Sequence, residues 1–195
     1  MKSVSDIAGY IANKYNIKLQ PEELQQFASI MEFRKLKKGE VFLDQGQVAK
    51  DIIYVHSGTM RLFYYKKGRD ITEHFACADT HFVYSIISLF QKRRTELMIE
   101  ALEQSIIYTI NYDKMRLLLL QIPQLAKLYI DILEEGLIIS QKKADSWRLE
   151  TVKERYERFF KEYPEVVKIA SVNHIASYLL MAPESLSRIR GAEVL

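Results

Sequence analysis

Apolar residues recur along this chain with two different spacings, and the change of spacing divides the chain into three parts. In the first part they stand three or four positions apart, as on one face of an α-helix. These residues are Ile7, Tyr10, Ile11 and Tyr15, followed after Pro21 by Leu24, Phe27, Ile30 and Met31. From Phe33 to about Asn111 the apolar residues form short runs, and after Tyr112 the helical spacing returns. The pattern predicts short helices, then a sheet, then a helical remainder.

The middle part is typical of β-structure. Its runs are rich in Val, Ile, Phe, Tyr and Thr and read EVFL, DIIYV, TMRLFYY, ITEHF, HFVYSII, ELMIEAL and SIIYTI. Gly39, Gly46, Gly58 and Gly68 punctuate them. Short strands separated by turn residues tend to pair with antiparallel neighbours, so we expect a small antiparallel barrel or sandwich.

A long helical pattern follows Pro123 and runs from about Gln124 to beyond Trp147. It is longer than an average globular helix, so it needs a packing partner. One seam at heptad spacing consists of Leu125, Tyr129, Ile132, Gly136 and Ile139. This seam predicts a homodimer held by a two-stranded coil. The alternative is that the seam packs on the barrel of its own chain, and Gly136 with polar Ser140 weakens the heptad signal.

Two short helical patterns meet at a sharp break between Ser171 and Arg190. The first pattern has Ser171 as a candidate N-cap, and its inward residues are Val172, Ile175, Ala176 and Leu179. The second begins with Pro183, which suits a first helical turn, and places Leu186 and Ile189 inward. Two helices joined in this way predict a helix-turn-helix.

The outward face of the second pattern carries Glu184, Ser187 and Arg188. A carboxylate can accept from cytosine, an arginine can donate twice to guanine, and a serine can do either. This face therefore has the chemistry of major-groove readout. The alternative is a solvated helix face with a glutamate and an arginine four residues apart.

Composition narrows the function classes without choosing among them. The chain has 195 residues, a net charge of +3 and a hydrophobic content of 48%, which is enough for a packed core. Basic and acidic residues are interleaved, so no basic tail dominates. The apolar runs, such as Leu117 to Leu120, are far shorter than a membrane span, and the N-terminus lacks the apolar segment of a signal peptide. We therefore expect a cytoplasmic protein without membrane contact.

Metal binding and catalysis find little support. The lone Cys77 excludes an internal disulfide and a four-cysteine zinc site. His74, Cys77 and His81, with Asp79 nearby, offer metal-ligand chemistry, but their spacing matches no standard motif. No catalytic triad, paired-carboxylate motif or phosphate loop is visible, so we expect neither an enzyme nor a bound cofactor.

Four stretches carry a resemblance to a known family. They are KKGEVFLDQG at 37–46, DIIYVHSGTMRLFYYKKGRD at 51–70, the segment 99–129, and PESLSR at 183–188. The chain resembles the Crp/Fnr superfamily of bacterial transcription regulators over essentially its whole length.

The resemblance implies a domain order and a set of partners. It implies an α+β chain with a jelly-roll-like, cyclic-nucleotide-binding-like barrel and N-terminal helices over 1–122, a dimerisation helix over 123–148 and a DNA-binding domain over 149–195. The partners would be a second copy of the chain and palindromic double-stranded DNA with a TTGA-like half-site, with RNA polymerase as a further candidate. The DNA-binding residues by position are Glu184, Ser185, Ser187, Arg188 and Arg190.

The phosphate-binding segment departs from the family pattern. In family members that bind cyclic AMP, the phosphate-binding segment resembles a Phe-Gly-Glu motif with an Arg about ten residues later. In this chain Tyr84, Ser85 and Thr95 stand at the Gly, Glu and Arg positions. We therefore expect no response to cyclic AMP. Arg94, next to Lys92 and Arg93, could hold another anion or be a solvated hairpin tip. The candidate ligand pocket comprises Tyr84, Ser85, Arg94, Thr95 and Ser140, and the effector is unknown.

The reading unit also departs from the family. Leu180 stands at a turn position where relatives often have Gly, and Ala182 precedes Pro183 where Ser or Thr would cap the helix. If Leu195 is the natural terminus, we expect no room for the two-stranded wing of many relatives. We interpret the chain as a homodimeric transcription regulator. The alternative is a dimeric ligand-binding or scaffold protein whose helix-turn-helix has decayed.

Overall fold

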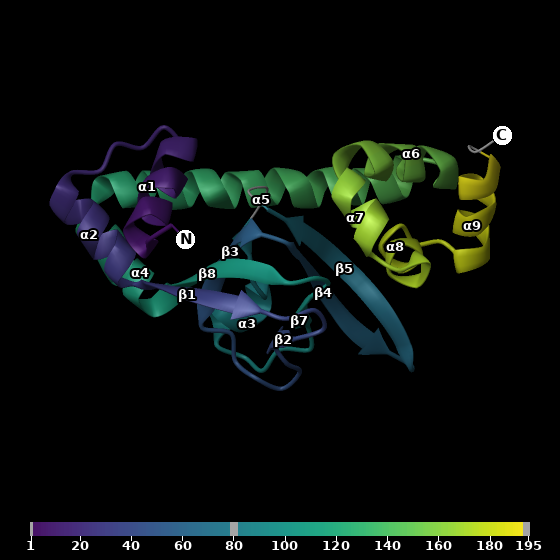
Figure 1. The fold of residues 1–195 in the computed structure, drawn as a ribbon, viewed down its shortest axis with the longest axis horizontal. Coiled ribbons are helices and arrows are strands. Elements are labelled where there is room, and N and C mark those ends of the chain that lie inside the picture. Colours follow the sequence, from purple (N-terminus) through teal and green to yellow (C-terminus); the bar gives the residue numbers. More distant parts are fainter. Residues whose placement is uncertain (1, 79–81, 193–195) are drawn as a thin grey trace.

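The structure is a computed structural model that describes residues 2–78 and 82–192. The helices are α1 (Val4–Lys14), α2 (Pro21–Ser29), α3 (Ile86–Gln91), α4 (Tyr112–Leu119), α5 (Pro123–Leu149), α6 (Val152–Glu162), α7 (Pro164–Ile169), α8 (Val172–Tyr178) and α9 (Pro183–Ala192). The strands are β1 (Met31–Leu36), β2 (Val41–Leu43), β3 (Asp51–Ser57), β4 (Thr59–Lys66), β5 (Arg69–Cys77), β6 (Phe82–Val83), β7 (Met98–Ala101) and β8 (Ser105–Asn111). The sandwich lies below α5, and α6 to α9 gather at one end of it (Figure 1).

The strands form two four-stranded antiparallel sheets, as the glycine-punctuated runs predict. Their orders are β1-β8-β3-β6 and β2-β7-β4-β5. The inner faces meet in a core that includes Ile53, Tyr54, Met60 and Ile107, all at most 1% exposed. A mixed α+β fold with an antiparallel sandwich and a long helix is therefore confirmed.

Gly58 makes the tight connection between β3 and β4. Its φ angle of +88° is one that side-chain-bearing residues rarely adopt. A Cβ at this position would lie 2.3 Å from Ser105 Oγ and 2.8 Å from the Ser105 Cα. The close approach of two backbones therefore requires glycine here.

The segment HFVYSII is only partly a strand. β6 ends at Val83, and α3 follows as a short helix, with Ser85 at its N-cap position but without a side-chain capping bond. Ser88 and Leu89 are buried in α3 while Ile86 and Ile87 are exposed. The expectation of a full strand is wrong here, because a continuous apolar run fits a short half-buried helix as well as a strand.

The predicted N-terminal helices cover one end of the sandwich. The Ser3 hydroxyl accepts from the Asp6 amide at 3.1 Å, and the Asp6 carboxylate accepts from the Ser3 amide at 2.8 Å, which starts α1. Pro21 starts α2. Ile7 and Phe27 point into the main core and are at most 1% exposed.

α5 lies along the sandwich as one continuous helix (Figure 1). Leu125, Leu128 and Ile132 are buried in the main core of their own chain. The alternative interpretation of the heptad seam therefore describes Leu125 and Ile132, because apolar surface already covered by the sandwich cannot cover a second helix. Tyr129 and Ile139 are half-buried and Gly136 is exposed. In the middle of α5, the exposed large apolar residues are Ile130, Leu137 and Ile138.

The helices after α5 share a second hydrophobic cluster with the sandwich. Helical spacing from Thr151 to Tyr163 predicts that Val152, Tyr156, Phe159 and Phe160 point inward. Tyr156 and Phe159 of α6 are buried in the cluster, whereas Val152 and Phe160 are exposed, so the prediction is wrong for these two. Phe75 of β5 belongs to this cluster rather than to the main core. The terminal helices therefore pack directly on the β4–β5 side of the sandwich.

Candidate DNA interface and candidate ligand pocket

α8 and α9 form the pair of helices that the C-terminal pattern predicts. The Ser171 hydroxyl accepts from the His174 amide at 3.1 Å and caps α8. Ile175 and Ala176 of α8 and Leu186 of α9 are each 0% exposed, and Ala176 is small enough for close helix packing. The inward face derived from the spacing is therefore buried.

The connection between α8 and α9 is conformationally strained. Leu180 has a φ angle of +53°, although its side chain is 54% exposed and gains little from packing. A left-handed conformation at a non-glycine residue costs of the order of 1 kcal/mol. The position where the family often has Gly therefore adopts the conformation that Gly favours, with Leu instead.

The expected reading face of α9 is open to solvent. Glu184, Ser187 and Arg188 are exposed, and Ser185 is half-buried. Arg188 Nε donates only to the Glu184 carbonyl of its own helix, at 3.4 Å. A guanidinium without a carboxylate partner among the described residues is available to an acceptor outside the chain.

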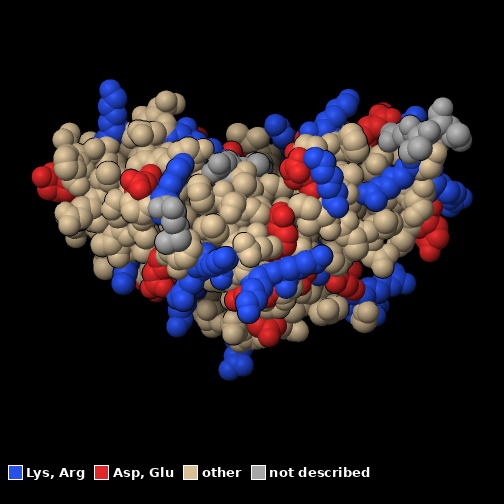
Figure 2. Space-filling model, viewed as in Figure 1, with Lys and Arg blue, Asp and Glu red and all other residues tan. Residues whose placement is uncertain are grey.

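Arg190 is less available than its neighbours. It is half-buried, and its Nε and Nη2 atoms are covered without a hydrogen-bond partner in the described part of the chain. Basic and acidic side chains alternate around this end of the molecule and form no patch of a single sign on the visible face (Figure 2). Any DNA contact here would therefore depend on individual side chains more than on a broad positive field.

A pocket lies between the sandwich, α3 and α5. Its volume is about 1010 Å³. The wall of this pocket includes all five residues that we expected to line a ligand pocket. They are Tyr84, Ser85, Arg94, Thr95 and Ser140. A Cβ added to Gly136 of α5 would lie 3.8 Å from the Tyr84 hydroxyl, so this side chain reaches across to α5.

The polar floor of the pocket is satisfied internally. The Ser85 and Thr95 hydroxyls lie 3.0 Å apart and are 2% and 5% exposed as residues. Thr95 Oγ1 also donates to the Leu97 carbonyl at 2.9 Å and accepts from the Leu97 amide at 3.0 Å. These hydroxyls bind each other and the backbone where related proteins that hold a phosphate would need a carboxylate and a guanidinium.

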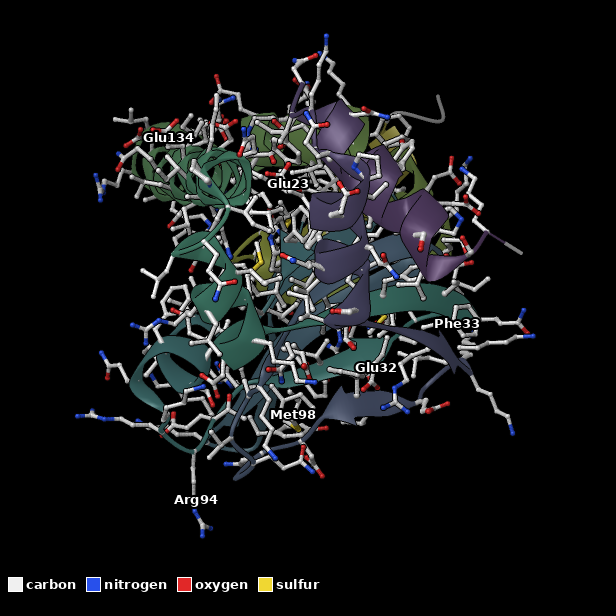
Figure 3. All side chains as sticks on the ribbon, turned by 90° about the vertical axis from the view of Figure 1, so that its left-hand side faces the viewer. Glu23, Glu32, Phe33, Arg94, Met98 and Glu134 are labelled. Carbon is white, nitrogen blue, oxygen red and sulfur yellow. The ribbon has the colours of Figure 1, made fainter. Side chains whose placement is uncertain are left out.

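Arg94 is exposed and points away from the molecule (Figure 3). Its neighbour Lys92 pairs with Asp113 at 2.8 Å. The solvated-tip alternative therefore describes Arg94, although its residue contributes to the pocket rim.

Sequence reasoning missed Lys143 of α5. Its side chain lines the pocket, and its Nζ donates to the Glu73 carbonyl of β5. Nζ also lies 4.7 Å from the ring centroid of Trp147 and 4.9 Å from that of Tyr178 on α8. Burial lowers the pKa of Lys143 to about 8, and the charge of Glu73 opposes that shift. The only advance signal was a lysine one helical turn before the single tryptophan.

Sequence reasoning also missed a buried charge network on the outer side of β4. The Arg61 side chain is 3% exposed and pairs with Asp70 and Glu100, each at 2.7 Å. His174 of α8 approaches Asp70 at 3.8 Å, and Ser177 Oγ of α8 accepts from the Thr72 amide at 3.0 Å. Burial, and then the charge of Arg61, lower the pKa of His174, so it stays neutral at physiological pH. α8 therefore contacts β5 through polar groups as well as through Phe75.

Only His74 and Cys77 of the four candidate metal ligands lie within the described residues. Asp79 and His81 lie outside the described residues. Within the described residues no group of three or more His, Cys, Asp or Glu side chains is arranged to hold a metal ion. No helix in that part of the chain combines the length and apolarity needed to span a membrane.

Two antiparallel sheets followed by a long helix, with a pocket between them, define the class of cyclic-nucleotide-binding folds. Residues 33–121 match the family model of the cyclic nucleotide-binding domain. No curated protein matches the chain in sequence.

Solved structures extend the likeness beyond the sandwich. FixK2 of Bradyrhizobium japonicum is 17% identical with a TM-score of 0.70, and the match covers 84% of each chain. The c-di-GMP responsive global regulator CLP of Xanthomonas campestris is 15% identical with a TM-score of 0.67 over 89% of this chain and 91% of that one. A protein of Eubacterium rectale described as a Crp/Fnr family regulator is 16% identical with a TM-score of 0.68 over 90% and 84%. The domain match and this shared fold confirm the resemblance to Crp/Fnr regulators.

Proposed function

We propose that this protein is a sequence-specific DNA-binding transcription regulator that acts as a homodimer and does not respond to cyclic AMP. The observation that carries the proposal is the open face of α9, where Glu184, Ser187 and Arg188 are exposed while Leu186 anchors the helix. These side chains match the donor and acceptor patterns of base edges in the major groove. The Crp/Fnr-like fold supports a regulator over an enzyme.

α5 is the proposed dimer helix, but its contact residues differ from those of the heptad seam. Ile130, Leu133 and Leu137 follow the three-and-four spacing of a coiled coil, and Ile130 and Leu137 are 52% and 71% exposed. A twofold axis along this stripe would present α9 twice. The operator is then a palindrome with half-sites about 34 Å apart, or a multiple of that distance.

Selection of bound sites from random duplex DNA tests the proposal. We expect enrichment of an inverted repeat, and Arg188→Ala should cost about 1–3 kcal/mol and relax the preference at one base pair of each half-site. Arg190→Ala, as a proposed phosphate contact, should weaken all sequences alike. Arg34→Ala is the matched control, because Arg34 is an exposed arginine on β1, far along the chain from α9.

An unchanged motif and affinity in Arg188→Ala would refute the assignment of α9 as reading helix. Failure to enrich any motif would favour the scaffold alternative, for which the strained Leu180 is the specific support. Insensitivity to cyclic AMP rests on the satisfied Ser85–Thr95 pair. A saturable rise in melting temperature with cyclic AMP would contradict it, since a ligand that binds only the native state must stabilise that state.

A further inference from the structure

The two long walls of the pocket are apolar. α3 contributes Ile86, Ile87 and Phe90, and α5 contributes Leu133 and Leu137. Ile87 is 63% exposed and Leu137 is 71% exposed in the single chain. Leu133 and Leu137 also belong to the proposed dimer stripe, so a second copy would close this side of the pocket over a bound ligand. Pockets lined in this way bind ligands whose body is apolar, because burial of both surfaces is favourable.

One cation stands at the end of these walls nearest α8. The Lys143 ammonium has three donor hydrogens, and the described residues provide one acceptor, the Glu73 carbonyl. No ion pair between Lys143 and a carboxylate occurs among the described residues, and the lowered pKa of this group agrees with incomplete compensation of its charge. The charge of Glu73 compensates this ammonium in part without an ion-pair contact, so an anion that reaches the half-buried ammonium stabilises it further.

The other cations around the pocket bind an anion only weakly, and the carboxylates around the pocket repel it only weakly. Lys66, Arg93 and Arg94 are exposed, and exposed pairs contribute little. Glu135 accepts a hydrogen bond from the Tyr15 hydroxyl at 2.5 Å, which holds its carboxylate toward α1. Glu96 and Glu73 are exposed to solvent, so water screens the repulsion between the Glu73 carboxylate and a bound anion.

We propose that this pocket binds a ligand with an apolar body and a single carboxylate, the body between α3 and α5 and the carboxylate on Lys143 Nζ. The ligand is either an aliphatic acid or an aromatic acid. Such an acid would be the effector of the regulator proposed above. Binding of the acid does not depend on that proposed function, whereas an effect of the acid on DNA binding does. Lys143 also contacts Tyr178 of α8 and β5, so a carboxylate that pairs with it changes a contact between the sandwich and the reading unit.

Titration of the full-length protein tests the proposal with decanoate, 4-phenylbutanoate, 1-decanol and cyclic AMP as probes. Trp147 is the only tryptophan, and its ring lies 4.7 Å from Lys143 Nζ, so its emission reports a ligand at that position. Calorimetry gives the affinity independently of the tryptophan. We expect saturable binding of at least one acid, about tenfold tighter than binding of 1-decanol, and no binding of cyclic AMP. The stronger acid identifies the aliphatic or the aromatic source.

Two variants and a control distinguish the contribution of the ligand's carboxylate from that of its apolar body. Lys143→Met should weaken binding of the preferred acid about tenfold and leave 1-decanol unaffected. Ile87→Asn should weaken both ligands, because it removes apolar wall. Lys142→Met, which removes an exposed neighbouring lysine, should change neither.

The proposal is overturned if neither acid binds, if acid and alcohol bind equally, or if Lys143→Met retains full affinity for the acid. These results are independent of the operator selection. Acid binding without any enriched DNA motif would refute the regulator and keep the pocket assignment, and the reverse result would do the opposite.

Discussion

At the residue scale, Gly58 shows how one position fixes the sandwich. Two constraints act together at Gly58: its positive φ, and the 2.3 Å that would separate an added Cβ from Ser105 Oγ. Neither constraint can relax by backbone movement, because β3 and β8 are held together by their antiparallel hydrogen bonds. Gly39 has a similar φ of +77° but no atom within 4 Å of an added Cβ. The two glycines therefore separate conformational strain from steric overlap.

We expect Gly58→Ala to destabilise the protein by several kcal/mol, and Gly39→Ala by about 1 kcal/mol, the usual cost of a left-handed alanine. Chemical unfolding of both variants measures the difference. Equal losses would show that the Ser105 contact relaxes at no cost and that only the φ angle matters.

Lys143 predicts a pH dependence of stability. Its folded pKa of about 8 is below the ordinary value of 10.5, so between these values the unfolded chain binds more protons than the native chain. The free energy of unfolding must then rise with pH over that window through this group. Wild type should gain stability from pH 8 to 10 relative to Lys143→Met, measured by urea unfolding at each pH. A constant difference between the two proteins would contradict the shift.

At the element scale, helices were easier to predict than their orientation. Ser171 caps α8 and Pro123 begins α5, as the sequence predicts, and Pro123–Leu149 is the long helix that the spacing predicts. The heptad seam was different, because α5 has two apolar stripes and spacing alone does not say which one meets the sandwich. The prediction of a strand at α3 was wrong for a related reason, since a short apolar run fits a strand and a helix equally.

The exposed stripe of α5 gives the dimer prediction. Replacing Ile130 and Leu137 together by Glu should yield folded monomers, because each carboxylate would be unpaired in an apolar seam but solvated in a single chain. Sedimentation gives the mass and circular dichroism the fold.

Ile132→Glu is the contrasting control for that experiment. Ile132 is 7% exposed and belongs to the main core, so its replacement should unfold the chain rather than separate copies. A wild-type protein that sediments as a monomer would end the dimer proposal.

At the scale of the whole molecule, the sandwich and the terminal helices are joined by a shared cluster. The Phe75 ring centroid lies 5.3 Å from that of Tyr178 and 5.9 Å from that of Phe159. No sequence pattern indicated this contact, because alternation along β5 does not say that helices cover the outer face, on which Phe75 lies opposite Arg61. Only the packing of α8 against that sheet shows what covers it.

Phe75→Ala should therefore cost about 3–5 kcal/mol and loosen α8 before it loosens β3 or β8. Native-state hydrogen exchange reads the two regions separately. Phe27→Ala, an equally buried replacement in the main core, should instead spare α8 relative to the sandwich. Matching exchange profiles for the two variants would show that the chain opens as one unit.

The same cluster bears on how such a protein can be rebuilt by recombination. Phe75 and Leu102 complete the hydrophobic cluster of α6 to α9. A cut after residue 149 therefore leaves the aromatic residues of the terminal helices uncovered and leaves an exposed apolar surface on β5. A chimera that exchanges only the terminal helices inherits both defects. Exchange of the terminal helices between relatives should give a folded chimera only when the β4–β5 hairpin is exchanged together with them.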